Sequence, residues 1–146
     1  MSYSQKQKAP WWFWAIGVLC LLWNLVGCGM YLAEHLMSDA DYAQLYGPEL
    51  FAVRDLTPSW AMAGYAVGVW GGFVGIVLLL WRKVLCLPFF YASFVGAVIG
   101  FLPSIFDTRF SSLMGVGDYA FMGFIWFECL FIIWFAKKMR ARGILA

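Results

Sequence analysis

One acidic residue, Glu128, interrupts a long apolar segment near the C-terminal end of the sequence, where a carboxyl group can exchange a proton or bind a cation. It lies about ten residues, or ~15 Å along a helix, from either end of that segment. A carboxylate at such a depth is costly unless it is paired, hydrated or protonated. No Lys, Arg or His interrupts the apolar segments at a comparable depth. We therefore expect Glu128 to be neutral, to face a polar cavity or to bind a cationic ligand.

Three polar residues in the other apolar segments lie at a similar depth and can hydrogen-bond this carboxyl. Asn24 donates and accepts, the indole of Trp70 donates, and Ser93 does either. Two interpretations stay open. Either these residues form a site for a proton or a ligand together with Glu128, or a protonated Glu128 only joins two helices through hydrogen bonds.

Other chemistry has no signature in this sequence. There is no phosphate-binding loop, no nucleophile–base pair, and no CxxC or zinc motif. His35 is the only histidine, and the nearby Asp39 and Asp41 do not complete a pattern of metal ligands. We therefore predict no enzyme activity, no cofactor and no metal. Four cysteines are expected to act as small buried hydrophobic residues, namely Cys20, Cys28, Cys86 and Cys129.

The composition indicates which solvent surrounds these residues. Of the 146 residues, 64% are hydrophobic, 21% aromatic and only 12% charged, whereas about a quarter of the residues in an average soluble domain are charged. A soluble protein of this size cannot bury so much apolar surface. The composition therefore excludes an ordinary soluble domain, a disordered tail and a nucleic-acid-binding module. It indicates a protein embedded in a lipid bilayer.

Four apolar segments are each close to the ~20 residues that a helix needs to cross a bilayer core. Backbone polar groups must be paired inside the bilayer, and no segment alternates as a barrel strand would, so each segment must be a helix. The predicted fold is a single-domain, all-α integral membrane protein, a bundle of four transmembrane helices. The segments are 11–33, 60–81, 85–106 and 119–136.

The first segment also has features of an export signal. Lys6 and Lys8 precede it, and Cys28 ends a lipoprotein-like cleavage box. The apolar run nevertheless continues beyond Cys28 and is long enough to span a membrane, unlike a typical signal sequence. We therefore expect a retained transmembrane helix.

Basic residues predict how the chain is threaded. Of the ten Lys and Arg residues, only Arg54 and Arg109 lie on one side of the predicted bundle, together with most of the acidic residues. The others precede the first segment, join the second to the third or follow the fourth. Because basic loops are retained in the cytoplasm, we expect both termini to be cytoplasmic.

The long loop between the first two segments, residues 34–59, is expected to form a small acidic cap outside the membrane. Ser38 is a typical N-cap for a short helix through Tyr46. Gly47-Pro48 ends that helix, and Pro48 can start another toward Asp55.

Proline and glycine predict the remaining boundaries. Thr57 and Pro58 are expected to be the N-cap and first residue of the second transmembrane helix. Pro103 is expected to kink or end the third helix near Leu102. The loop 107–118 is expected to be irregular.

Small residues follow helical spacing in the second and third segments. Such faces let helices approach closely in a membrane. They serve either packing within the four-helix bundle or a homodimer, and the sequence does not decide between them. The glycines are Gly64, Gly68, Gly72, Gly71 and Gly75 in the second segment, and Gly96 and Gly100 in the third.

Five groups of residues are spread along nearly the whole chain: Trp23-Asn24-Leu25 with Gly27 and Tyr31, Pro58-Ser59-Trp60, Val69-Trp70-Gly71-Gly72 with Gly75, Leu78-Leu79-Leu80 with Arg82-Lys83, and Trp134-Phe135-Ala136 with Lys137-Lys138. Through them the chain resembles a family of small four-span bacterial membrane proteins, which often carry the label "sugar transporter". The resemblance implies a compact bundle in the bacterial inner (plasma) membrane. It implies no catalytic residues.

Two functions fit these observations. The first is a small transporter-like or ligand-binding membrane protein with a polar intramembrane site around Glu128. The alternative is an accessory or assembly subunit of a larger membrane complex, in which Glu128 is a structural contact between helices. The expected partners are the lipid bilayer, a small-molecule ligand, and either a second copy or a partner membrane subunit.

Overall fold

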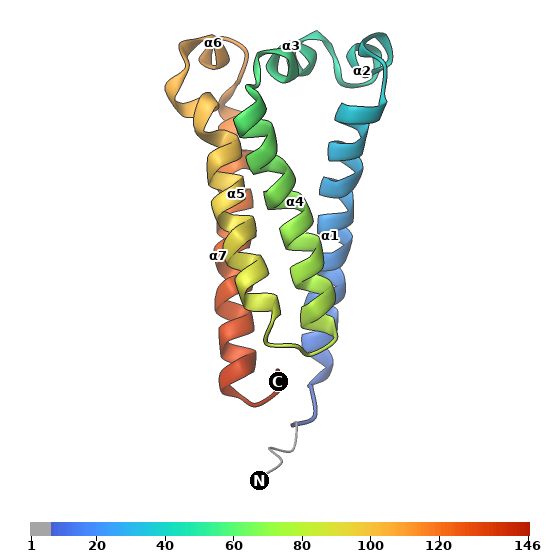
Figure 1. Cartoon of the computed structure of the whole chain (residues 1–146), viewed down its shortest axis with the longest axis vertical. Coiled ribbons are helices and arrows are strands. Elements are labelled where there is room, and N and C mark those ends of the chain that lie inside the picture. The colour runs from blue at the N-terminus through green and yellow to red at the C-terminus, as the bar shows by residue number, and fades with distance from the viewer. Residues whose placement is uncertain (1–6) are drawn as a thin grey trace.

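A computed structural model describes residues 7–146, and every regular element within them is a helix (Figure 1). Lys6, one of the basic residues used to predict the threading, lies outside the described residues. The helices are α1 (Trp11–Leu36), α2 (Asp39–Tyr46), α3 (Pro48–Leu56), α4 (Ser59–Leu80), α5 (Cys86–Phe106), α6 (Thr108–Ser111) and α7 (Val116–Ala141).

Four of these helices, α1, α4, α5 and α7, are long and apolar enough to cross a membrane. They contain the four predicted segments almost entirely, and their ends differ from the predicted ends by a few residues. The predicted all-α class and the presence of four helices able to span a membrane are therefore confirmed. The length and hydropathy of these helices indicate a multi-pass membrane protein.

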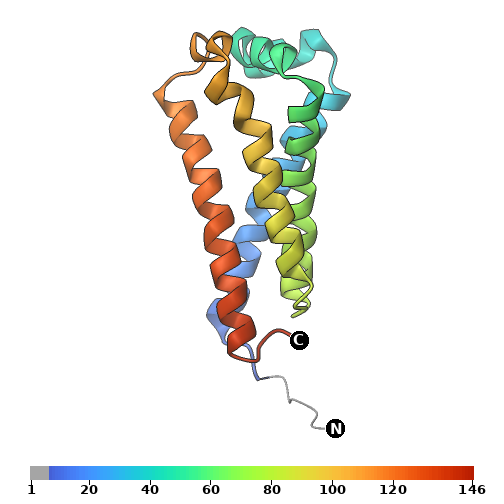
Figure 2. The ribbon, with the colours of Figure 1, turned by 60° about the vertical axis from the view of Figure 1, so that its left-hand side comes forward.

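The bundle is built around the pair α4 and α5, which pack against each other along most of their lengths. α1 packs on α4, and α7 packs on α5 (Figures 1 and 2). α1 and α7 contact each other through aromatic rings. Phe13 stacks on Phe135 at 6.0 Å between ring centroids, and Trp23 lies 5.3 Å from Phe124 in an edge-on arrangement.

Glycine makes the close approach of α4 and α5 possible. A Cβ atom on Gly96 would lie 2.5 Å from the backbone nitrogen of Gly68 and 2.7 Å from the carbonyl oxygen of Gly64. A Cβ on Gly100 would lie 3.2 Å from the backbone nitrogen of Tyr65. The backbones therefore touch where a larger residue would hold them apart.

The other glycines of α4 also face parts of the same chain. Gly71 lies against the backbone of Ser93, and a Cβ on Gly75 would meet the ring of Phe90 at 2.5 Å. Packing within the chain thus occupies the glycine faces that the sequence left open to a second copy.

Three short helices cover one end of the bundle, here called the capped end. Ser38 is the N-cap of α2, where its hydroxyl accepts a hydrogen bond from the Asp41 backbone. Gly47, at φ 91°, separates α2 from α3, which starts at Pro48. Arg54 of α3 joins the two helices through an ion pair with Asp39 at 2.6 Å. The pair of short helices expected between residues 34 and 59 is confirmed.

One helix boundary differs from the prediction, and the end of α5 at residue 106 excludes one of the two effects expected of Pro103. Thr57 is not the N-cap of α4, because its hydroxyl donates to the carbonyl of Val53 at 2.7 Å and ends α3, so that Pro58 takes the N-cap position. α5 does not end near Leu102 but continues through Pro103 to Phe106. The carbonyl of Pro103 still accepts a hydrogen bond from the Asp107 backbone at 2.9 Å, which completes a last helical turn.

The loop 107–118 is also more regular than predicted. Asp107 accepts a hydrogen bond from the backbone of Arg109 and so caps the single turn of α6. α7 begins at Val116, where the side chain of Asp118 caps the first turn by accepting from the Gly115 backbone at 2.8 Å. Within 107–118, only Asp107 and residues 112–115 lack helical structure.

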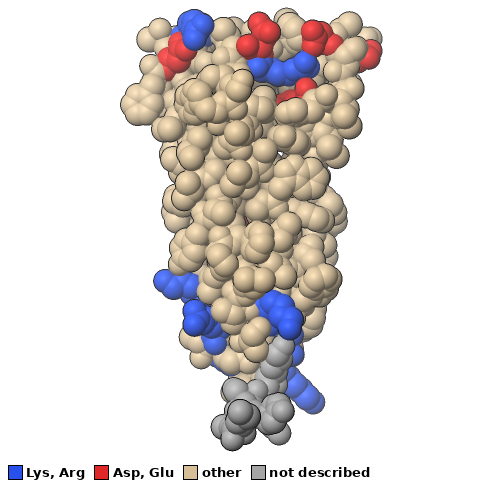
Figure 3. Space-filling model, in the orientation of Figure 1, with Lys and Arg blue, Asp and Glu red and all other residues tan. Residues whose placement is uncertain are grey.

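The opposite end, here called the terminal end, holds both ends of the described chain (Figure 1). Residues 142–146 pair with the turn between α4 and α5, where the backbone of Val84 donates to Ala146 and that of Ala146 to Arg82. The charged side chains separate by sign between the two ends, with basic residues alone at the terminal end and most acidic ones at the capped end (Figure 3).

Candidate functional site

Polar side chains from α1 and α5 converge on one glycine of α4 inside the bundle. The side-chain oxygen of Asn24 occupies the space that a Cβ on Gly72 would need, and the hydroxyl oxygen of Ser93 lies 3.1 Å from the same position. Gly72 is itself buried. The absence of a side chain at Gly72 therefore lets two polar groups from different helices meet.

The hydrogen bonds of these two residues determine what they offer to a ligand. The Asn24 amide nitrogen donates to the carbonyl of Cys20 at 2.9 Å, which turns its oxygen toward Gly72. The Ser93 hydroxyl donates its proton to the carbonyl of Gly68 at 2.6 Å. Ser93 thus uses its only donor and Asn24 uses one of its two N–H groups, and both residues keep oxygen lone pairs that can accept.

α7 contributes the remaining groups. The thiol of Cys129 is buried and lies beside both the Ser93 hydroxyl and the Glu128 carboxyl. Glu128 is half-buried on α7, and Cys20 of α1 is linked to the same region through its carbonyl, which accepts from Asn24. We name this arrangement of residues from all four long helices the polar layer; it consists of Cys20, Asn24, Gly72, Ser93, Glu128 and Cys129.

No cation balances the carboxyl in the polar layer. The ion pairs found within residues 7–146 join Arg54 to Asp39 and Arg109 to Asp107, both at the capped end. Basic residues within the four long helices occur only toward the helix ends; they are His35 in α1 and Lys137, Lys138 and Arg140 in α7. The structure thus brings Asn24 and Ser93 together at Gly72, whereas Glu128 is connected to them through its neighbour Cys129 and has no basic partner within residues 7–146.

Trp70, the fourth predicted site residue, lies elsewhere. Its indole ring is 38% exposed and packs edge-on against Tyr31 of α1 and Phe73. Each residue advances a helix by about 100°, so Trp70, two residues before Gly72, points ~200° away from it around the axis of α4. Trp70 and Gly72 therefore lie on opposite sides of this helix. The side chains of Asn24 and Ser93 therefore meet at Gly72 and not at Trp70.

Sequence reasoning did not assign Cys20, Cys129 or Gly72 to the site. Cys20 is four residues before Asn24 and Cys129 follows Glu128 directly, so both lie near a predicted polar residue in sequence. Gly72 was interpreted only as a packing residue. The spacing of residues within one helix does not show which other helix faces Gly72.

The structure also describes the environment of His35. Its Nδ1 atom lies 2.8 Å from the carbonyl oxygen of Tyr31, and its ring stacks on that tyrosine at 4.2 Å between centroids. Within residues 7–146, no three His, Cys, Asp or Glu side chains gather closely enough to hold a metal ion.

Comparisons with known proteins identified no relative of this chain. The chain matches no protein-family model, no curated protein and no solved structure.

Proposed function

We propose that this protein is a small transporter-like, ligand-binding membrane protein whose polar layer binds a cation in exchange for the proton of Glu128. One observation carries the proposal. The polar layer holds oxygen acceptors from three helices, namely the Glu128 carboxyl, the Asn24 amide oxygen and the Ser93 hydroxyl oxygen.

A set of acceptors selects a ligand that donates hydrogen bonds or carries positive charge. Without such a ligand, an unpaired carboxylate in a bilayer is so costly that Glu128 holds a proton. With a cation bound, the carboxylate is paired, and the proton is released. Proton and cation therefore compete for the same oxygen atoms, which is the coupling that a proton-driven transporter needs.

We expect a ligand to reach the polar layer by separating α1 from α7. These helices belong to different pairs, α1 with α4 and α7 with α5, and their middle sections meet through the rings of Trp23, Phe121 and Phe124. Contacts between aromatic rings can be broken without breaking hydrogen bonds. The faces of these rings also attract cations. We therefore expect an organic cation with aromatic rings to enter between these rings toward Glu128.

The distribution of charge supports a sidedness for the bundle. We propose that the terminal end faces the cytoplasm of a bacterium, that the capped end lies outside the inner membrane, and that α2 and α3 form an acidic extracytoplasmic cap. A cysteine introduced at Glu49, in an otherwise cysteine-free variant, is expected to react with a membrane-impermeant maleimide added to intact cells. Labelling only after cell lysis would reverse this orientation.

Binding of tetraphenylphosphonium, a lipophilic cation that carries four phenyl rings, tests the proposed function. We expect the purified wild-type protein to bind it in detergent and Glu128→Gln to bind it roughly tenfold more weakly or not at all, because the pairing charge is gone. Glu49→Gln removes a carboxylate at the capped end and serves as the matched control, with wild-type affinity. Equal affinity in all three proteins would contradict the proposal.

An accessory-subunit function is the second candidate, and the exposure of α1 favours it. Only 11% of the most apolar stretch of α1 is buried, against 33% in each of the other three long helices. A partner helix can therefore cover α1 in a larger complex. Purification in a mild detergent distinguishes the two functions, because a stoichiometric membrane partner is expected only for a subunit.

A further inference from the structure

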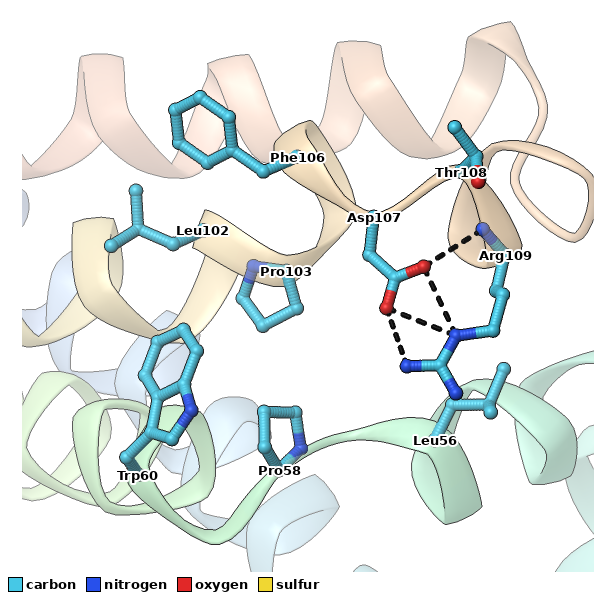
Figure 4. Close-up of a pocket in the computed structure, with 9 residues that line it drawn as sticks. All are labelled: Leu56, Pro58, Trp60, Leu102, Pro103, Phe106, Asp107, Thr108 and Arg109. Carbon is cyan, nitrogen blue, oxygen red and sulfur yellow. Dashed lines mark hydrogen bonds and ion pairs between the residues drawn. The ribbon is translucent and has the colours of Figure 1, made fainter.

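A cleft of about 510 Å³ lies at the capped end, outside the polar layer. Its walls come from the junction of α3 with α4, from the last turn of α5 and from α6 (Figure 4). Most of these walls are apolar, and the only charged residues that line the cleft are Asp107 and Arg109. The apolar lining consists of Leu56, Pro58, Trp60, Leu102, Pro103 and Phe106.

Asp107 holds the guanidinium group of Arg109 in a fixed position. Nε of Arg109 donates to both carboxylate oxygens at 3.1 Å, and Nη2 donates to Oδ2 at 2.6 Å. Asp107 is itself fixed as the cap of α6 by the Arg109 backbone at 3.0 Å. The side chain is therefore oriented before any ligand arrives, which lowers the entropy cost of binding.

This arrangement leaves donors, not acceptors, at the rim of the cleft. No acceptor among residues 7–146 takes the hydrogens of Nη1, and the Arg109 side chain is 65% exposed. Nη1 is turned away from Asp107 toward the side of the cleft formed by Leu56 and Pro58 (Figure 4). Both oxygens of Asp107 already face Arg109. The group that complements this rim is an anion with several oxygens, and a guanidinium pairs well with a phosphate.

The cleft lies at the level where a bilayer changes from hydrocarbon to headgroups. α4 and α5 contain 22 and 21 residues, or ~32 Å at 1.5 Å per residue, which matches a bilayer core of about 30 Å. The cleft is at the ends of both helices, where Trp60 and Phe106 are 52% and 79% exposed. Aromatic side chains favour this depth.

We propose that this cleft binds a membrane phospholipid, with its phosphate on Arg109 and the start of an acyl chain along Trp60, Leu102 and Phe106. An apolar wall below a single oriented guanidinium matches a molecule that carries a phosphate above a hydrocarbon chain. Free phosphate matches the rim alone and leaves the apolar walls exposed.

Native mass spectrometry of the protein released from nanodiscs of phosphatidylglycerol and phosphatidylethanolamine tests this site. We expect one phospholipid to remain on the wild-type protein. We expect Arg109→Gln to reduce the lipid-bound fraction roughly tenfold, as for the loss of a charge-assisted hydrogen-bonded pair. Arg109→Lys keeps the charge and is expected to retain part of the binding. Arg140→Gln, at the terminal end, is the matched control and should retain wild-type binding.

Two further measurements keep the result interpretable. Thermal unfolding in lipid-free detergent should stay cooperative for Arg109→Gln, with a melting temperature only slightly below that of the wild type because the exposed pair with Asp107 is lost, which shows that the variant is folded. Trp60→Ala should also lose bound lipid, because it removes an apolar wall and leaves the rim intact. Full lipid retention by both variants would overturn the proposal. Equal stabilisation of the wild type by inorganic phosphate and by phospholipid would overturn it as well, because a lipid site requires the acyl chain.

Discussion

The side-chain oxygen of Asn24 fills the space that a side chain on Gly72 would occupy, so one glycine lets α1 and α4 share a polar contact inside the bundle. The Ser93 hydroxyl of α5 lies 3.1 Å from the same point. A methyl group at this position must displace the amide of Asn24, which separates it from Ser93 and from the groups of α7.

Gly72→Ala tests this contact directly. We expect it to weaken tetraphenylphosphonium binding severalfold, because the amide oxygen is pushed out of the polar layer, and to destabilise the fold by about 1–3 kcal/mol through overpacking. Binding and thermal unfolding are measured on the same preparation. Gly123→Ala is the control, because a Cβ there would meet nothing within 4 Å. Unchanged cation affinity in Gly72→Ala would show that Asn24 is not part of the site.

Gly96→Ala is expected to be more damaging to stability than Gly123→Ala. A Cβ on Gly96 would lie 2.5 Å and 2.7 Å from backbone atoms of α4, which cannot rotate away as a side chain can. Overpacking of this kind costs about 1–3 kcal/mol. Gly123→Ala should be neutral or stabilise by up to about 1 kcal/mol, because alanine favours a helix. Reversible unfolding in mixed micelles measures both. Equal free energies of unfolding for Gly96→Ala and Gly123→Ala would mean that α4 and α5 lie farther apart than the structure shows.

Ser93→Ala removes the hydrogen bond from α5 to the carbonyl of Gly68. Hydrogen bonds between helices in a membrane contribute about 1 kcal/mol, so we expect a loss of that size in the free energy of unfolding. Ser111→Ala removes a comparable bond to Thr108 on an exposed turn and should cost much less. If the two variants are equally stable, the Ser93 bond contributes little to helix packing.

The pair formed by Asp107 and Arg109 predicts a pH dependence of stability. Hydrogen bonds from Arg109 lower the pKa of the Asp107 carboxyl below its ordinary value of 3.8. A lowered pKa in the folded state means that the pair stabilises the fold above that value and that this contribution is lost as the pH falls. Melting temperatures measured during acidification should therefore fall less steeply for Asp107→Asn than for the wild type. Asp55→Asn, an exposed carboxylate without an ion pair within residues 7–146, should follow the wild type.

The sequence predicted the elements of the fold well and their contacts less well. Apolar length predicted all four long helices, because a bilayer restricts the chain to helices of a given span. Ser38 and Gly47-Pro48 predicted α2 and α3, because capping and helix breaking depend on local backbone chemistry. Thr57 failed as an N-cap for the same local reason, because its hydroxyl had a closer acceptor in the helix that it ends.

The polar layer was predicted in part. Depth along a helix follows from counting residues, and it placed Glu128, Asn24 and Ser93 at one level. The direction in which a side chain points depends on which helices are neighbours. Trp70 has the right depth but faces Tyr31, and Gly72 could be assigned to the site only once α1 and α5 were placed beside it.

Proton release on cation binding tests the central claim most directly. The claim is that the Glu128 carboxyl holds a proton until a cation replaces it. Titration of tetraphenylphosphonium into the purified protein in weakly buffered detergent near neutral pH is expected to release close to one proton per cation bound, and Glu128→Gln is expected to release none. Cation binding by the wild type without proton release, or the same release from Glu128→Gln, would contradict the claim.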